Sequence, residues 1–144
     1  MVPNVAVLDH PLDAGAIRAA LTDPAAGSVV LFEGCARNHH EERAVEELAY
    51  EAYPPMAEKE LARLREAALS RFELLRCLIH HRIGPVPITE AAVVVGCASA
   101  HRQASFEAVT WIMDEIKKTV PIWKRERYQA GQEAWVEGTA RREP

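Results

Sequence analysis

An unbroken apolar run over residues 91–98 (AAVVVGCA), followed at once by a helical pattern, restricts the fold of this chain more than any other segment. A valine-rich apolar run of this length is typical of a strand that is buried on both faces. From Ala100 to Lys118 apolar residues then recur at helical spacing, with one face formed by Phe106, Val109, Met113 and Ile116. We therefore expect a buried strand within a sheet, and an amphipathic helix that covers the sheet.

The rest of the chain alternates between strand and helix patterns. Strands are predicted over residues 27–36, 47–52 and 74–83, and helices over residues 9–21, where Asp9 can act as the cap, and 54–72. Residues 37–42 are polar and predict a loop, residues 84–87 close a strand, and Trp135 and Val136 predict a short edge strand. Interleaved strands and helices favour the α/β class, as a two-layer sandwich.

The composition fits one folded domain. The chain has 144 residues without a repeat or a long Gly/Ser linker, so we expect a single domain over residues 1–144. Its net charge of −4 disfavours a general nucleic-acid binder, and its apolar stretches are too short to span a bilayer. The start of the chain shows no secretory signal, and three cysteines without close pairs disfavour a disulfide framework. We expect a cytoplasmic protein that binds neither nucleic acid nor membranes.

A first candidate site is the segment Ser-Ala-His-Arg at residues 99–102, where the buried strand gives way to the helix. With Ser99 as the cap, the backbone amides of His101 and Arg102 are free, and free amides at the positive end of a helix dipole bind anions. Basic side chains are unfavourable at this end unless an anion neutralises them. The pair therefore indicates a phosphate site, with two solvated surface residues as the alternative.

A second candidate site is the segment KKTVPIWKRE at residues 117–126. Pro121 fixes a turn after the helix, and this turn can bring Lys117 and Lys124 towards each other. Neighbouring ammonium groups lower each other's pKa, and a lysine tuned in this way can act as an acid, a base or an amine nucleophile. The alternative is a helix end that carries lysines because the helix dipole favours them.

A third candidate site is the segment FEGCARNHH at residues 32–40. Arg37 leaves the end of a strand into a polar loop, and its guanidinium suits a phosphate or a carboxylate. The histidine pairs at residues 39–40 and 80–81 lack the spacing of a zinc motif, so we expect no metal site. Cys35 lies in an apolar run, where a cysteine is usually a small hydrophobic residue rather than a nucleophile.

Together these segments resemble the large, catalytic subunit of molybdopterin synthase. The matching stretches are VVLFEGCARNHH, LAYEAYPPMAEKEL, HHRIGPVPITEAAVVVGCASAHR, SFEAVTWIMDEIKKTVPIWKRE and the later WVEG. They follow in order from Val29 to Gly138, so the resemblance covers most of the chain. The family often has threonine and valine where this chain has Cys35 and Ala36, and neither position carries a required group.

The resemblance implies a reaction and its partners. The family converts cyclic pyranopterin monophosphate, a pterin phosphate, into molybdopterin by inserting two sulfurs as a dithiolene, and needs no metal or other cofactor for this step. The sulfur arrives as a thiocarboxylate on the C-terminal Gly-Gly tail of a small, ubiquitin-like partner subunit. The large subunits form a homodimer with one small subunit at each far end, a heterotetramer. The family fold is an α/β hammerhead with added antiparallel strands.

The resemblance also implies roles for individual residues. Lys117 and Lys124 match the family's catalytic lysines. The substrate-binding positions that match are Arg37, His101 and Arg102, which contact the substrate phosphate, and Arg125 and Glu126, which flank the second lysine. A non-catalytic module that binds a phosphate ligand, or a regulator, is the alternative, and turnover distinguishes the two.

Helix geometry predicts how these residues meet. His101 and Lys117 are sixteen residues apart, about 24 Å along a helix, which their side chains cannot close around one small pterin. We expect a pocket shared across a twofold axis, with the lysines from one chain and His101 and Arg102 from its mate. The competing explanation is a helix broken near Thr110, which would bring both ends together within one chain.

Overall fold

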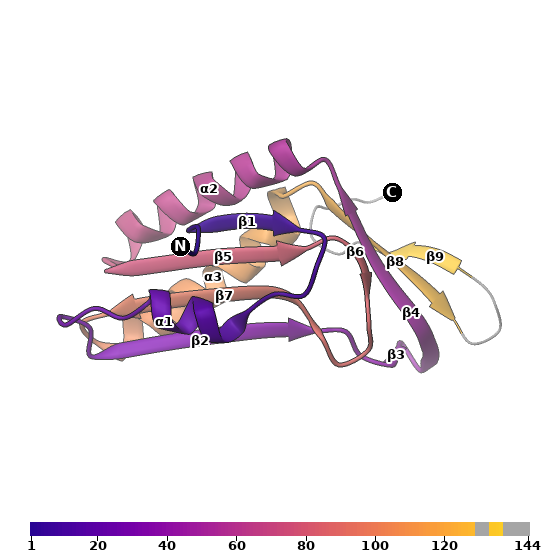
Figure 1. The fold of residues 1–144 in the computed structure, drawn as a ribbon, viewed down its shortest axis with the longest axis horizontal. Coiled ribbons are helices and arrows are strands. Elements are labelled where there is room, and N and C mark those ends of the chain that lie inside the picture. The colour runs from indigo at the N-terminus through magenta and orange to yellow at the C-terminus, as the bar shows by residue number, and fades with distance from the viewer. Residues whose placement is uncertain (129–132, 137–144) are drawn as a thin grey trace.

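The computed structural model describes residues 1–128 and 133–136 of the chain. In chain order its elements are β1 (Val5–Leu8), α1 (Ala14–Ala20), β2 (Ser28–Cys35), β3 (His39–His40), β4 (Arg43–Ala52), α2 (Pro54–Arg71), β5 (Arg76–Arg82), β6 (Gly84–Val86), β7 (Ala91–Ser99), α3 (Arg102–Thr119), β8 (Ile122–Tyr128) and β9 (Glu133–Val136). The α/β class expected from the sequence is confirmed, with α2 and α3 packed against a sheet (Figure 1). Gly138, the last residue of the resemblance, lies outside the described residues.

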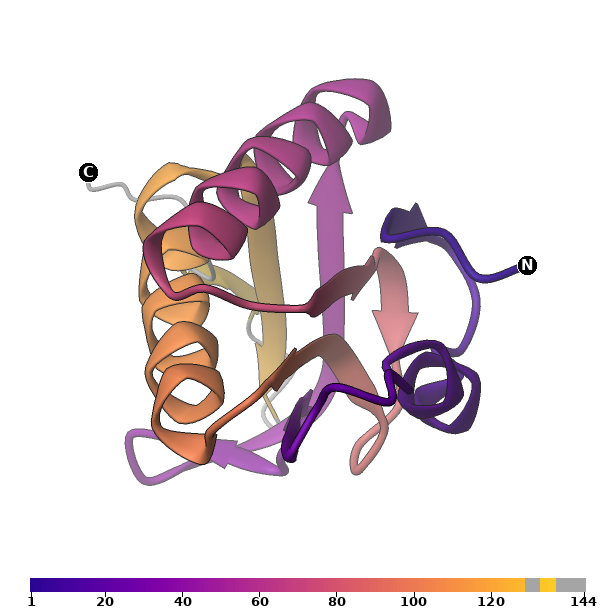
Figure 2. The same ribbon diagram turned by 90° about the vertical axis from the view of Figure 1, so that its left-hand side faces the viewer.

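The first sheet has the strand order β1-β5-β7-β2. β7 therefore lies in the interior of the sheet, as its apolar sequence predicts, and it runs antiparallel to both β5 and β2. Figure 2 shows α2 and α3 on one face of this sheet and α1 on the other. Because side chains alternate along a strand, β5 and β7 supply both faces: Ile79 and Val95 pack under α2 and α3, and Leu78 and Val94 under α1.

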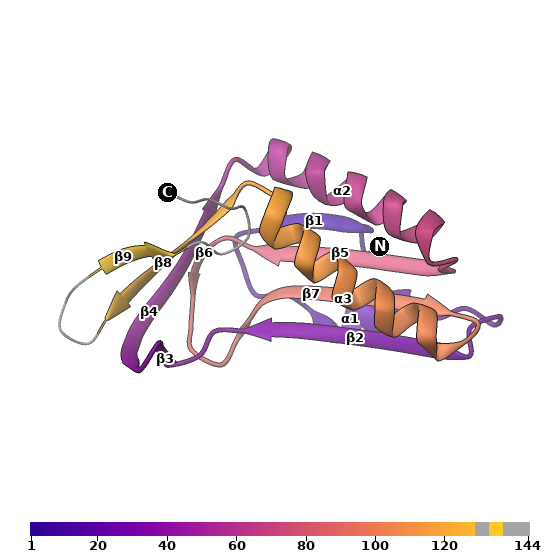
Figure 3. The same cartoon turned by 180° about the vertical axis from the view of Figure 1, so that it is seen from behind.

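The second sheet has the strand order β3-β4-β8-β9, and β6 pairs with β4 off this path. β4 and β8 are antiparallel, and Tyr50 lies opposite Lys124 in their register. β8 begins at Ile122, directly after the end of α3, so the C-terminal end of the helix stays beside this sheet (Figure 3). Side chains from both sheets and from α3 can therefore converge at one place.

The first helix starts later than the sequence indicates. α1 begins at Ala14 rather than near Asp9. Its cap is Asp13, whose Oδ1 accepts a hydrogen bond from the Ala16 amide at 2.9 Å. This contact satisfies one of the amide donors that a helix start leaves open, and it fixes where the helix begins.

Ser99 does not cap α3, contrary to the prediction. The cap is His101, and Ser99 is the last residue of β7. The Ser99 hydroxyl donates to the His101 carbonyl at 2.7 Å and contacts the Ser105 hydroxyl. These two buried contacts occupy the hydroxyl, so it makes no hydrogen bond to an amide of the first helical turn.

The sequence pattern misses several short strands. Neither β1 nor β6 is predicted, and β3 lies within the segment expected to be a loop. β3 and β4 form a tight hairpin in which His40 lies opposite Arg43. The two connecting residues, Glu41 and Glu42, both have positive φ, 50° and 68°. Such short segments become strands because the tertiary structure brings them a partner strand, which local periodicity does not reveal.

Candidate active site

A cavity of about 360 Å³ lies where the two sheets meet the end of α3. Its volume is in the range of small-molecule binding sites. The polar and charged residues that line it are Cys35, Arg37, His40, Tyr50, His81, Lys117, Lys124 and Glu126. Among the described residues that line the cavity, two lysines and an arginine face one carboxylate, so positive charge is in excess.

Lys117 and Lys124 reach this cavity from two different elements. Lys117 lies in the last turn of α3, and Lys124 lies on β8. Burial is the largest influence on Lys124 and lowers its pKa; Lys117 and Arg37 lower this pKa further, while Glu126 raises it. Lys117 therefore lowers the pKa of Lys124, as the sequence predicts for neighbouring lysines, but burial lowers this pKa more. A lysine whose pKa is lowered is better suited to exchange a proton near neutral pH.

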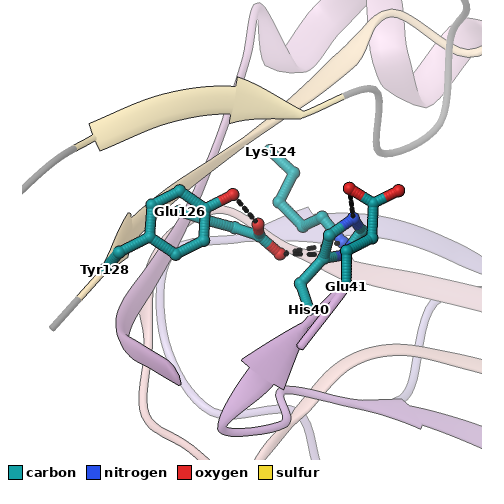
Figure 4. A network of polar contacts seen from close by, with 5 residues as sticks. All are labelled: His40, Glu41, Lys124, Glu126 and Tyr128. Atoms are coloured by element: carbon teal, nitrogen blue, oxygen red, sulfur yellow. Dashed lines mark hydrogen bonds and ion pairs between the residues drawn. The ribbon is translucent and has the colours of Figure 1, made fainter. Parts of the chain in front are cut away.

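Glu126 joins Lys124 to a network of polar side chains (Figure 4). Its Oε2 lies 3.8 Å from Nζ of Lys124 and 3.4 Å from Nδ1 of His40. Its Oε1 accepts a hydrogen bond from the Tyr128 hydroxyl at 2.8 Å. Lys124, Glu126 and Tyr128 alternate along β8, so the pleat of the strand places all three on the same face. The buried carboxylate is thus held in one orientation by partners on both of its oxygens.

Tyr50 and His81 form a neutral part of the cavity wall. Their rings meet edge to face, with centroids 5.2 Å apart. Burial, with a smaller contribution from Glu126, raises the pKa of Tyr50 to about 12. Burial lowers the pKa of His81 to about 4. Nδ1 of His81 donates to the Arg82 carbonyl at 2.9 Å, which leaves the other ring nitrogen as a hydrogen-bond acceptor.

His101 and Arg102 lie at the opposite end of α3 from Lys117. α3 is one continuous helix of 18 residues, so the predicted alternative of a helix broken near Thr110 is wrong. A helix of this length extends about 27 Å. Within one chain, His101 and Arg102 therefore do not reach the cavity that holds the lysines.

Arg125 faces the opposite side of β8 from Lys124 and Glu126, because consecutive strand residues point to opposite faces. Its guanidinium lies 5.8 Å from the centre of the Trp135 ring on β9. Arg125 is therefore the neighbour of the second lysine in sequence, but it is not among the described residues that line the cavity.

The described residues hold neither a metal-binding cluster nor a membrane-spanning helix. Within residues 1–128 and 133–136, no three His, Cys, Asp or Glu side chains gather closely enough to hold a metal ion. In the same ranges, no helix is both long and apolar enough to cross a bilayer.

Sequence reasoning does not place Tyr50 or His81 in the site, and it includes His40 only as part of the candidate segment at residues 32–40, without a role. For Tyr50 a signal exists in the alternating pattern of β4. Leu48 and Tyr50 are two residues apart and share one face of the strand, and both line the cavity. For His81 the signal is its place in a strand buried on both faces. His40 is brought in only by the β3–β4 hairpin, which the polar sequence of residues 37–42 does not indicate.

A mixed α/β fold that gathers two lysines, an arginine and a buried glutamate around a small-molecule cavity defines an enzyme subunit suited to acid–base or group-transfer chemistry. The sequence profile described as "MoaE protein" matches residues 7–119. The molybdopterin synthase catalytic subunit of Pyrococcus abyssi is 45% identical over 120 residues, which cover 83% of this chain and 80% of that protein. The chain belongs to the MoaE family, the catalytic subunits of molybdopterin synthase, which act in molybdenum cofactor biosynthesis.

Solved structures agree on the fold. The molybdopterin synthase from Staphylococcus aureus matches with a TM-score of 0.89 and 32% identity, over 94% of this chain and 98% of that chain. A Helicobacter pylori structure, described as a protein–protein complex of subunits 1 and 2 of molybdopterin-converting factor, has a TM-score of 0.74 and 16% identity, over 96% and 93% of the two chains. The second likeness shows the fold alone. The family resemblance found in the sequence is confirmed, and the enzyme is favoured over the non-catalytic module.

Proposed function

We propose that this chain makes the dithiolene of molybdopterin by inserting two sulfurs into cyclic pyranopterin monophosphate. Each sulfur comes from the C-terminal thiocarboxylate of a small, ubiquitin-like partner subunit. In each transfer a thiocarboxylate sulfur bonds to a substrate carbon as a C–O bond at that carbon breaks, and water then cleaves the resulting thioester, so the partner leaves as a carboxylate and no net oxidation takes place. The observation that carries the proposal is the convergence of Lys117, Lys124 and Arg37 on one small cavity.

The charge of the cavity suits both reactants. The precursor carries a phosphate and the partner's tail carries a thiocarboxylate, so both are anions. Among the described residues, three cationic side chains face the cavity against the single carboxylate of Glu126. The walls of a cavity exclude water and strengthen the attraction between such charges. Arg37 also presents a planar guanidinium fork, which suits phosphate or carboxylate oxygens.

The two lysines have complementary roles in this proposal. As sulfur adds and oxygen leaves, the departing oxygen must gain a proton. Lys124, whose pKa burial lowers, is suited to give and take that proton. Lys117 extends into the cavity from the end of α3 and stabilises the negative charge that develops on the reacting atoms, or forms a transient amine adduct.

A second copy of the chain completes the pocket. β2 is an edge strand of the first sheet: its start at Ser28 lies opposite the end of β7, and its last residue, Cys35, lines the cavity. Antiparallel pairing of two β2 edges about a twofold axis places the Ser28 end of each chain beside the Cys35 end of the other. The strand spans about 26 Å, close to the length of α3, so this pairing brings His101 and Arg102 of one chain towards Lys117 of its mate.

The assembly is then a homodimer with one small partner subunit at each far end. The Pyrococcus abyssi relative is named a catalytic subunit, which supports a further subunit for this chain. A Gly-Gly tail can enter a narrow channel because glycine has no side chain. The pterin phosphate and the tail therefore meet at the lysines from different sides of the pocket.

Reconstitution tests the proposed function. The purified chain is mixed with thiocarboxylated partner and cyclic pyranopterin monophosphate, and the product is followed by mass spectrometry. We expect a product in which two sulfurs replace two oxygens. A partner with one bulky residue added after its last glycine should give no product, because the sulfur donor no longer sits at the right place. A non-catalytic binding module would bind the precursor and leave it unchanged, which would contradict the proposal.

A further inference from the structure

His40 lies between Glu126 and Glu41 and contacts both carboxylates (Figure 4). Its Nδ1 lies 3.4 Å from Oε2 of Glu126, the same oxygen that faces Lys124. Its Nε2 lies 3.5 Å from Oε1 of Glu41. The side chains of Glu126, His40 and Glu41 are 3%, 25% and 85% exposed. The three residues therefore form a continuous polar path from the interior to water.

An imidazole can accept a proton on one ring nitrogen and release another from the second. Glu126 and Glu41 lie against different ring nitrogens of His40, which is the arrangement that such a transfer requires. We propose that Glu126, His40 and Glu41 relay protons between Lys124 and solvent, a role that rests on Lys124 exchanging a proton in the proposed reaction. His40 acts on Lys124 through Glu126, so it is a positioning residue.

Each transfer in the relay moves one proton. In the outward direction, the Lys124 ammonium gives a proton to Oε2 of Glu126, and Glu126 passes it to Nδ1 of His40. His40 releases the proton on its Nε2 to Glu41, which gives it to water. Lys124 is left as a neutral amine, and the inward direction reverses every step. The separations of 3.4–3.8 Å exceed those of most direct hydrogen bonds, and a bridging water can carry a proton across gaps of this size.

The charges around the path favour movement of a proton from Lys124 towards Glu41. Lys117 and Arg37 face Lys124 from the cavity. On the far side of His40 lies the exposed carboxylate of Glu41. A proton that leaves Lys124 therefore moves away from two other cations and towards an anion. The guanidinium of Arg43, opposite His40 in the hairpin, lies over the ring of Tyr128, 3.7 Å from its centre.

The turn that carries Glu41 has an unfavourable backbone. Glu41 and Glu42 are the two connecting residues of the hairpin, and both have positive φ. Glycine and asparagine are the residues that such positions favour. Strained backbone of this kind concentrates at functional sites. At Glu41 the conformational cost of the positive φ is offset by the contact of its carboxylate with Nε2 of His40. Neither glycine nor asparagine can place a carboxylate there.

The first test compares two histidines on the same short strand. His40→Asn keeps a polar group beside Glu126 but cannot accept a proton and pass another on. His39→Asn is the matched control, because His39 is exposed and its ring contacts Asn38. The measured quantity is the rate at which the Lys124 ammonium hydrogens exchange with water, followed by ¹⁵N NMR on the full chain alone. We expect His40→Asn to slow this exchange about tenfold and His39→Asn to leave it unchanged.

A second pair of variants separates the relay from folding. Glu41→Asn and Glu42→Asn both relieve a positive φ, so both should raise the Tm. Glu41→Asn alone removes the carboxylate beside His40 and should slow the exchange at Lys124 several-fold, while Glu42→Asn should not. A slower exchange in a protein that has become more stable cannot come from unfolding. Equal exchange rates in the wild type, His40→Asn and Glu41→Asn would overturn the relay.

Turnover separates the relay from the proposed function. In the reconstituted enzyme, His40→Asn should lower kcat about tenfold with an unchanged KM for the precursor. In His40→Ala, added imidazole should restore part of kcat in proportion to its concentration, which a purely structural role would not produce. Slow ammonium exchange in His40→Asn, together with no turnover by the wild type, would uphold the relay and overturn the proposed function.

Discussion

Oε2 of Glu126 lies 3.8 Å from Nζ of Lys124, and the carboxylate is only 3% exposed. Burial is the largest influence on the pKa of Lys124 and lowers it, and Lys117 and Arg37 act in the same direction. Glu126 opposes all three and raises this pKa. The protonation of Lys124 is therefore decided by a balance in which one buried carboxylate supports the ammonium form.

Glu126→Gln should shift this balance. Removal of the negative charge lowers the pKa of Lys124 further, so the neutral amine forms at lower pH than in the wild type. The pH dependence of reductive methylation at Lys124, measured by mass spectrometry, should move towards acid, and kcat should fall about tenfold or more. Glu47→Gln is the control, because Glu47 pairs with Arg127 away from the cavity. If Glu126→Gln left the pH dependence of methylation at Lys124 unchanged, the coupling between Glu126 and Lys124 would be contradicted.

Lys117→Ala and Lys124→Ala should both abolish most of the activity. Both side chains face the cavity, and neither anchors the core. Their roles fall in the transition state, so the loss should appear in kcat, by about 10²- to 10⁴-fold, with partner binding nearly intact. Single-turnover assays and partner titration measure the two effects separately. Wild-type turnover by Lys117→Ala would show that this lysine has no catalytic role.

Mixing two inactive variants should restore activity if the pocket is shared between chains. Arg102→Ala and Lys117→Ala, combined after subunit exchange, give heterodimers in which one of the two pockets is intact. Equal amounts with random exchange should recover about a quarter of the wild-type activity. Native mass spectrometry confirms the exchange. Confirmed heterodimers without activity would exclude the shared pocket.

His81 should make the protein less stable as the pH falls. Burial lowers the pKa of its imidazole from 6.5 to about 4. Above pH 6.5 the folded and unfolded forms are both neutral, and the stability is fully present. Between pH 6.5 and 4 the unfolded chain takes up the proton first, so about 3 kcal/mol of stability is lost, and below pH 4 the loss is complete.

His81→Gln should remove this pH-dependent loss while keeping a donor for the Arg82 carbonyl. The measurement is the free energy of unfolding in urea at several pH values for both proteins. We expect the difference between them to change steadily from pH 7 to pH 4. A difference that stays constant with pH would show that His81 is not the group responsible.

Gly96 is a packing requirement at the centre of the first sheet. A Cβ at this position would overlap Cδ1 of Leu21, a fully buried side chain of the α1 core. Gly96→Ala should therefore destabilise the protein by about 1–3 kcal/mol in denaturant unfolding. Leu21→Ala vacates the space that a Cβ at position 96 needs. The double variant Gly96→Ala/Leu21→Ala should therefore lose less unfolding free energy than the sum of the losses in the two single variants. Additive costs would show that the two residues do not compete for the same volume.

Sequence patterns identify the longest elements, the short helix α1 and the edge strand β9, but not β1, β3, β6 or β8. The apolar run over residues 91–98 identifies β7, and the helical spacing of Phe106, Val109, Met113 and Ile116 identifies α3. β8 is not predicted because the face that begins with Ile122 continues with Lys124, Glu126 and Tyr128 rather than with further aliphatic residues. A strand that turns charged groups towards a cavity lacks the apolar alternation that periodicity detects.

The sequence by itself determined the α/β class, the interior position of β7 and the membership of the family. It also indicated that the two lysines on either side of Pro121 lie close to each other. These features depend on local periodicity, on the backbone limits of proline and on a specific order of motifs. Only the tertiary structure decided that His40, Tyr50 and His81 meet those lysines, that Arg125 faces the other side of β8, and that His101 lies beyond the reach of Lys117 within one chain. The reason is that hairpin register, strand pleat and helix length set distances between residues far apart in sequence, and no local pattern records those distances.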